Sequence, residues 1–194
     1  MKDMPTIAAL AGRRIDASDT TEVRFPLSSV AKVARALESL LSEFRVEHLI
    51  CSAACGADLL ALDAARRLGI DATIILPFDE NAFRETSVTD RPGDWGTLYD
   101  HAISRAHRFD TLIDLGLRYT DDDAYDRATA RIIDQVRTRR AARRLAIAVW
   151  EGAPRGADDA TADFLAQARA AHLETYEIAT LRQTSSSDLG ADNA

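Results

Sequence analysis

The chain has 194 residues, 46% of them hydrophobic, so we expect one domain with a sizeable core. Its formal net charge is −7 at pH 7, so we expect no attraction to nucleic acids or anionic membranes. No apolar run is long enough to span a bilayer, and the first five residues lack the apolar segment of a signal peptide. The sequence therefore predicts a cytoplasmic protein with no nucleic-acid and no membrane partner.

Apolar runs rich in β-formers alternate with segments of helical periodicity. The predicted strands are Thr6–Ala11, His48–Ser52, Ala72–Leu76, Phe109–Leu115, Leu145–Trp150 and Glu174–Ile178. The predicted helices are Leu27–Phe44, a helix running through Leu59 to Leu68, Gly93–Ala106, Asp123–Arg140 and Asp159–Ala171. This alternation predicts a three-layer αβα fold with a Rossmann-like, doubly wound, mostly parallel sheet of about six strands. Residues 1–182 would form this one domain, and residues 183–194 a disordered tail.

Two connections in this pattern are long. They are Gly12–Pro26, after the first predicted strand, and Pro77–Pro92, after the third. Connections in such folds usually have about two to six residues. Both connections leave the carboxyl ends of strands, which is the edge where open α/β sheets bind ligands. We therefore expect both of them to contribute to a binding site.

The first long connection begins with a glycine and two arginines. Gly12 permits a sharp exit from the strand, and the guanidinium groups of Arg13 and Arg14 offer paired donors suited to phosphate or carboxylate. Asp16 would accept a hydrogen bond from a ribose hydroxyl or pair with an arginine. A surface loop with a local Arg–Asp pair is the alternative interpretation.

A turn of small residues joins the second predicted strand to the following helix. This arrangement aims free backbone N–H groups at an anion, and it predicts a nucleotide-type ligand. Asp58, in the first turn of the helix, would either cap the helix or hold a ribose hydroxyl. The residues of this turn that we expect at the ligand are Ser52, Ala54, Gly56 and Ala57.

Aromatic and acidic residues follow the third and fifth predicted strands. After the third strand come Pro77 and Phe78, and Phe78 would stack on a base or, as an aromatic at a strand end, belong to the core. Trp150 and Gly152 close the fifth strand and would form the far wall of the site. The segment from Gly156 to Thr161 enters the last helix as a second anion-binding turn, but Asp158 or Asp159 would cap that helix and place a negative charge there.

Two further features carry no ligand chemistry in our interpretation. Cys51 and Cys55, the only cysteines, are predicted to be buried thiols, with no disulfide, no metal and no cofactor. The arginine run 137–144 falls at the end of a predicted helix, at the amino edge of the sheet, and predicts a solvated face opposite the ligand.

Several of these segments, in this order, resemble the SLOG superfamily of Rossmann-like domains, which includes the LOG phosphoribohydrolases and the DNA-uptake protein DprA. The resemblance extends to about residue 180 and is closest to stand-alone bacterial members. It implies a domain that binds nucleotides or nucleotide-derived signals, commonly as a sensor. The matching residues are Gly12–Asp16, Arg24–Pro26, Ala54–Asp58, Leu76–Phe78, Phe83, Ser87–Val88, Trp95, Tyr125 and Val149–Gly152.

The chain departs from the LOG enzymes where their catalytic motif would lie. Those enzymes carry Pro-Gly-Gly-x-Gly-Thr-x-x-Glu, whereas residues 156–163 here lack most of the glycines and keep only Asp163 near the catalytic position. No GxSxG, Walker A, HExxH or GxGxxG motif is present. We therefore expect ligand binding without catalysis.

Two alternatives remain open at this point. The first is an N-glycosidase or phosphoribohydrolase, with its essential acid among Glu80, Glu85, Glu151 and Asp163. The second is an interaction subunit, with a homodimer or an effector protein as partner, that exposes apolar residues on its outer helices. The residues to inspect for such a surface are Phe44, Trp95 and Phe164.

Overall fold

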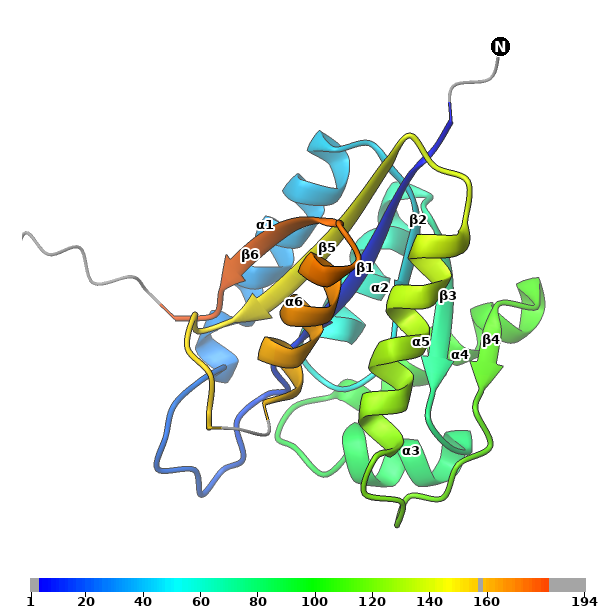
Figure 1. Ribbon diagram of the computed structural model, residues 1–194. Helices are drawn as coiled ribbons and strands as arrows, with labels where there is room; N and C mark the ends of the chain where they lie inside the picture. The colour runs from blue at the N-terminus through cyan, green and yellow to red at the C-terminus, as the bar shows by residue number, and fades with distance from the viewer. Residues whose placement is uncertain (1–3, 157–158, 182–194) are drawn as a thin grey trace, which may run out of the picture.

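The computed structural model describes residues 4–156 and 159–181, and its centre is a six-stranded, all-parallel sheet in the order β4-β3-β2-β1-β5-β6 (Figure 1). The predicted tail from residue 183 lies outside the described residues. The strands are β1 (Thr6–Gly12), β2 (Val46–Cys51), β3 (Asp71–Leu76), β4 (Leu112–Asp114), β5 (Arg143–Trp150) and β6 (Glu174–Ala179).

Helices cover both faces of this sheet. Those labelled α1, α2 and α4 share one buried cluster with the sheet, and α5 and α6 share the other. The fold is thus the predicted three-layer, doubly wound α/β arrangement. No helix within the described residues is both long and apolar enough to cross a membrane. The helices are η1 (Leu27–Ser29), α1 (Val30–Glu43), α2 (Ala57–Leu68), α3 (Glu80–Ser87), α4 (Trp95–Phe109), α5 (Ala124–Thr138) and α6 (Ala160–Ala170).

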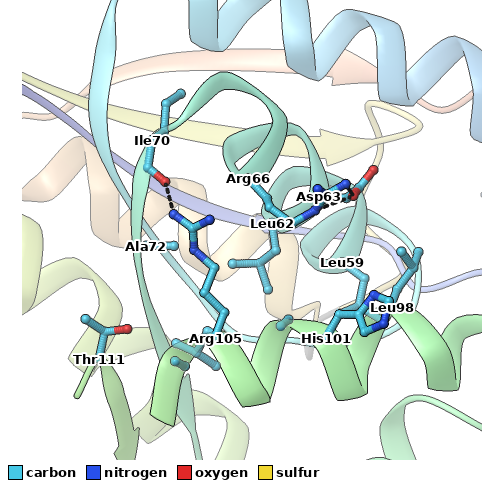
Figure 2. Close-up of a pocket in the computed structure, with 13 residues that line it drawn as sticks. Leu59, Leu62, Asp63, Arg66, Ile70, Ala72, Leu98, His101, Arg105 and Thr111 are labelled. Atoms are coloured by element: carbon cyan, nitrogen blue, oxygen red, sulfur yellow. Dashed lines mark hydrogen bonds and ion pairs between the residues drawn. The ribbon is translucent and has the colours of Figure 1, made fainter. Parts of the chain in front are cut away.

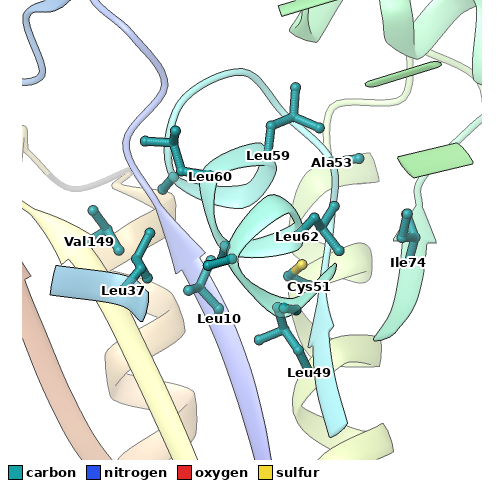
Figure 3. Packing of buried hydrophobic residues seen from close by; sticks show 14 of the residues in the cluster. Leu10, Leu37, Leu49, Cys51, Ala53, Leu59, Leu60, Leu62, Ile74 and Val149 are labelled. Atoms are coloured by element: carbon teal, nitrogen blue, oxygen red, sulfur yellow. The ribbon is translucent and has the colours of Figure 1, made fainter. Parts of the chain in front are cut away.

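Strand β1 lies at the centre of the sheet because its two faces are both apolar. Ala8 and Leu10 point into the cluster with α1 and α2, and Ile7 and Ala9 point into the cluster with α5 and α6. Figure 3 shows Leu10 packed among side chains of α1, α2 and the neighbouring strands. The chain grows outward from β1 in both directions, through β2 on one side and β5 on the other. This reversal of strand order opens a crevice at the carboxyl edge.

The structure corrects the sequence prediction in two places. The connection Pro77–Pro92 is not one long loop, because it contains α3. Asp79 caps this helix by accepting hydrogen bonds from the N–H groups of Asn81 (3.1 Å) and Ala82 (3.0 Å). The fourth strand is shorter than predicted, because α4 continues to Phe109. Asp110, whose φ is 54°, is the C-cap of this helix.

Gly12 lies where three elements meet at the end of β1. A Cβ atom at this position would lie 2.6 Å from the Cβ of Ala57 and 2.6 Å from the carbonyl oxygen of Val149. We expect Gly12→Ala to lower the free energy of unfolding by about 2 kcal/mol, because neither neighbour can move without shifting backbone. Urea unfolding measures the loss. Gly96→Ala is the matched control, since its nearest neighbour is the flexible end of Arg84. An equal loss in both variants would contradict this explanation.

Candidate functional site

A pocket of about 400 Å³ lies at the carboxyl edge of the sheet, where the strand order reverses. It is lined by the loop after β1, the turn before α2, the end of α3 and the starts of α5 and α6. The predicted site residues that line it are Gly12, Arg13, Arg14, Asp16, Ser52, Ala54, Asp58 and Thr161. Those that do not are Gly56, Ala57, Pro77, Phe78, Trp150, Gly152 and Gly156.

Several lining residues were not among the predicted site residues. In a parallel sheet every connecting helix begins at the carboxyl edge. The position of Tyr125 and Thr129 in the first turns of α5 could therefore have been used to predict that they line the site. Arg91 and Arg155 lie in loops and carry no sequence signal of their own. The missed polar lining residues are Thr20, Glu22, Arg24, Ser87, Arg91, Tyr125, Thr129 and Arg155.

Arg13 is buried in a network of ion pairs that ties β1 to the β5–α6 connection. Its side chain is 4% exposed. The Nε atom donates to Glu151 Oε2 (2.6 Å) and Nη1 donates to Asp159 Oδ1 (2.8 Å). The Nη2 atom donates to Glu151 Oε1 and to the carbonyl oxygen of Ala153, both at 3.0 Å. The guanidinium group also lies over the ring of Trp150. Arg13 is therefore satisfied by the protein itself.

The carboxylates of this network stay ionised despite their burial. Burial alone would raise the pKa of Glu151, but hydrogen bonds from Arg13 and Arg24 lower it below the usual value. Burial opposes ionisation of Asp159 too, and here Arg13 with two backbone N–H groups holds the pKa well below its usual range. Asp159, one of the two caps predicted for α6, accepts from Thr161 N (3.0 Å) and Ala162 N (3.1 Å). The other, Asp158, lies outside the described residues.

Asp16 closes the loop that follows β1. Its carboxylate accepts hydrogen bonds from the backbone N–H of Arg24 (3.0 Å) and of Phe25 (3.0 Å), and its own N–H donates to the carbonyl oxygen of Phe25 (3.0 Å). The loop's stem is thereby pinned beside the pocket. The carboxylate thus bonds the loop's backbone and not an arginine side chain, and a contact between Asp16 and a ribose hydroxyl stays a prediction.

The turn before α2 packs against the loop after β1. Gly56 has a φ of +94°, and a Cβ atom there would lie 2.7 Å from the carbonyl oxygen of Arg13. The N–H of Ala57 donates to that same oxygen (3.2 Å), and the N–H of Cys55 donates to the carbonyl oxygen of Ser87 (3.0 Å). These two N–H groups of the predicted anion cradle are already bonded within the protein.

Asp58 is the one carboxyl group in the pocket whose pKa is strongly raised. It is 7% exposed, and it accepts a hydrogen bond from the N–H of Ala54 (3.1 Å). Burial raises its pKa to about 7, because the Ala54 hydrogen bond and the charge of Arg14 offset only part of the desolvation. A carboxyl group that titrates near neutrality in a pocket is a candidate functional group.

Phe78 is a core residue, the second of the two roles considered for it. It is 1% exposed and packs against Phe83 and Tyr125. Tyr125, in contrast, is 45% exposed and lines the pocket. Its hydroxyl shares a hydrogen bond with Ser87 Oγ (2.9 Å). The accessible aromatic side chain of the site is thus Tyr125.

None of the four carboxylates considered for catalysis lines the pocket. Glu151 belongs to the Arg13 network, and Glu80 pairs with His107 (2.6 Å). Glu85 and Asp163 are exposed on α3 and α6. No two of these four carboxylates therefore lie together in the pocket.

The residues inspected for a protein-binding surface are mostly inside the protein. Phe164 is fully buried and Trp95 is 4% exposed. Phe44 packs against Tyr176, with ring centroids 4.5 Å apart, beneath the guanidinium group of Arg143. These side chains form no exposed apolar patch.

Neither cysteine lines the pocket, and the arginine run lies at the amino edge of the sheet. Cys51 and Cys55 are free and buried, and burial raises the pKa of both thiols. Across residues 4–156 and 159–181, no group of three or more metal-binding side chains is arranged to hold an ion.

In the arginine run, Arg143 pairs with Glu174, and Arg144 donates to carbonyl oxygens at the end of α5.

A second, apolar crevice of about 40 Å³ lies between α2, α4 and β3. Figure 2 shows Leu59, Leu62 and Leu98 facing one another there. At its end, Arg105 donates to the carbonyl oxygen of Ile70 (3.5 Å). A crevice of this volume has room for only about three water molecules. This crevice is therefore too small for a nucleotide-type ligand, whereas the arginine-lined pocket at the carboxyl edge of the sheet is large enough for one.

Comparison with known proteins gives the fold and little more. No protein-family model and no curated protein sequence matches the chain. Among solved structures, DNA processing protein A (DprA) from Streptococcus pneumoniae is similar over 95% of this chain and 52% of its own, with 14% identity and a TM-score of 0.53. The Moco carrier protein from Chlamydomonas reinhardtii is similar over 90% and 76%, with 14% identity and a TM-score of 0.44. The chain thus spans about half of the DprA chain, and at this identity the likeness shows a related fold.

Proposed function

We propose that this chain is a SLOG-type module that binds or senses a nucleotide or a nucleotide-derived signal at the carboxyl edge of its sheet. The observation that carries the proposal is the charge of the pocket. Five arginines line it, although the whole chain has a net charge of −7. Three of these arginines are paired with Glu22, Glu151 or Asp159, whereas Arg14 and Arg91 share the one carboxylate of Asp90. A local positive site in an acidic protein favours a small anionic ligand over a polyanion.

The remaining lining residues support a nucleotide within that class. Hydroxyl groups of Ser52, Thr129 and Thr161 offer hydrogen bonds to a sugar, and Tyr125 offers a ring face to a base. The pocket volume of about 400 Å³ falls within the usual range for small-molecule sites. We propose binding without turnover: the carboxylates considered for glycosidic cleavage lie outside the pocket, and Asp58 within it is held by the N–H of Ala54.

Ligand-observed proton NMR tests this function. NAD, ADP-ribose, AMP and cyclic nucleotides are each mixed with the protein and followed overnight. We expect the signals of one ligand to broaden without the appearance of new peaks. Release of a free base or ribose would replace the proposal with an N-glycosidase, and no broadening with any of these ligands would overturn it.

Tyr125→Leu is expected to weaken binding of the ligand found in this way by about tenfold, because a base–aromatic stack contributes roughly 1–3 kcal/mol. Isothermal titration calorimetry measures the change. Tyr119→Leu is the matched control, since Tyr119 is 66% exposed and does not line the pocket. Equal affinities of the Tyr125 variant and the wild type would show that no base stacks on the Tyr125 ring.

A further inference from the structure

We propose that Arg14 and Arg91 form the subsite for the anionic group of the ligand, and that the carboxylate of Asp90 occupies this subsite until the anion displaces it. The inference deepens the proposed function and rests on it. It assigns the anion to one wall of the pocket and gives Asp90 the role of an internal competitor.

The two arginines reach the pocket wall from different loops. Arg14 follows β1 and Arg91 follows α3, and their side chains are 29% and 28% exposed. Both approach one carboxylate: Arg14 Nη2 bonds Asp90 Oδ1, and Arg91 Nε lies 3.4 Å from Asp90 Oδ2. Two guanidinium groups thus share the carboxylate of Asp90, and the other carboxyl group on which the charge of Arg14 acts, Asp58, has a pKa raised to about 7.

Both arginines also have an unused donor. The Nε atoms of Arg14 and Arg91 are buried, and neither has a hydrogen-bond partner. Buried donors are rarely left unpaired, because the loss of water is not compensated. A phosphate carries several acceptor oxygens, and it would pair with more of these donors than one carboxylate does once the guanidinium groups turn from Asp90 toward the pocket.

Arg13 does not share this property. Its Nε, Nη1 and Nη2 atoms all donate to protein oxygens. Arg24 is likewise paired, with Glu22 and Glu151. Of the two arginines predicted from the sequence, Arg14 is therefore the one that offers donors to a ligand, and its structural partner is Arg91.

The exposure of Asp90 allows another anion to displace its carboxylate. Its side chain is 34% exposed, so the carboxylate can turn into water when another anion takes its place. An exposed carboxylate loses little by this exchange, since exposed ion pairs contribute about 0–1 kcal/mol. The exchange favours an anion with more charge and more acceptor oxygens than a carboxylate has.

Calorimetric titrations with AMP and with inorganic pyrophosphate test the subsite. We expect Arg14→Gln and Arg91→Gln each to weaken binding by about tenfold, the usual effect of losing hydrogen bonds to a charged group. Asp90→Asn is expected to tighten binding by about threefold, because the competing charge is gone. Arg118→Gln, which removes an equally charged side chain that is 80% exposed and paired with Asp121, should leave both affinities unchanged.

The outcomes separate this inference from the function on which it rests. If the wild type binds AMP and the two glutamine variants bind it equally well, the subsite is wrong and the function stands. If the wild type binds neither probe, nor any ligand of the NMR panel, both proposals are wrong. Weaker binding by Asp90→Asn would overturn the competitor role. Tighter binding, in contrast, cannot result from misfolding of the variant.

Discussion

Replacing Arg13 with methionine is expected to lower the free energy of unfolding by about 3 kcal/mol, because the buried carboxylates of Glu151 and Asp159 lose their positively charged partner. The side chains of Glu151 and Asp159 are 8% and 1% exposed, so water does not replace the lost bonds. Glu151 keeps Arg24, and Asp159 keeps its backbone donors, which is why the loss stays at the lower end of the range for a broken buried pair. Urea unfolding at pH 7 measures it.

Two comparisons show whether charge is the cause. In the double variant Arg13→Met with Glu151→Gln, one stranded charge is removed, and the total loss should be at least about 1 kcal/mol smaller than the sum of the two single losses. Arg66→Met removes an arginine that is 52% exposed and paired with Asp63, and should cost less than about 1 kcal/mol. Additive losses in the double variant would contradict the network.

The same network gives the wild type a distinct response to acid. Arg13 lowers the folded-state pKa of Glu151 and Asp159, so their contribution to stability is present above the unfolded-state pKa and is lost as the pH falls through the folded-state pKa. The Arg13→Met variant should therefore lose less stability than the wild type between neutral and acidic pH.

Asp58→Asn is expected to stabilise the protein at pH 8 by about 4 kcal/mol, because burial raises the pKa of Asp58 from 3.8 to about 7. A raised folded-state pKa means that the folded protein binds the extra proton. The stabilising effect of that proton is complete below the unfolded-state pKa and is lost as the pH rises through about 7. Asparagine carries no charge at any pH and keeps an oxygen for the N–H of Ala54.

The dependence on pH is the decisive part of this prediction. The difference in unfolding free energy between Asp58→Asn and the wild type should be small at pH 4, should grow up to about pH 7 and should then level off. Asp63→Asn, which removes a carboxylate from the same helix at a side chain that is 21% exposed, serves as the control. A constant difference for Asp58→Asn would contradict a raised pKa.

The fold could be predicted because burial leaves a regular pattern in the sequence. The strands β1 and β5 are apolar runs, and α1 and α5 show long helical periodicity, so the alternation and the parallel sheet followed from the sequence. Helix α3 was missed because it has only eight residues, of which Phe83 and Ser87 are buried. Such a short helix leaves too few buried positions to reveal a period.

The site was predictable only in part. Its edge followed from topology, and the sequence indicated Arg14, Ser52 and Asp58, which line the pocket at that edge. The pairing of Arg13 with Glu151 and Asp159 joins residues 138 and 146 positions apart, and no local pattern reports a partner at that distance. For this reason the sequence placed Arg13 and Arg14 in one role, whereas the structure separates them.

Mapping backbone amide shifts shows whether a nucleotide-type ligand binds in the arginine-lined pocket. ¹H–¹⁵N spectra of the labelled protein are recorded with increasing AMP, or with the ligand that broadens in the NMR panel. We expect saturable shifts at Arg14, Ser52, Asp58, Arg91 and Tyr125, and no shifts at the amino edge around Arg143. Saturable shifts confined to the amino edge, or to the crevice between α2 and α4, would contradict this expectation.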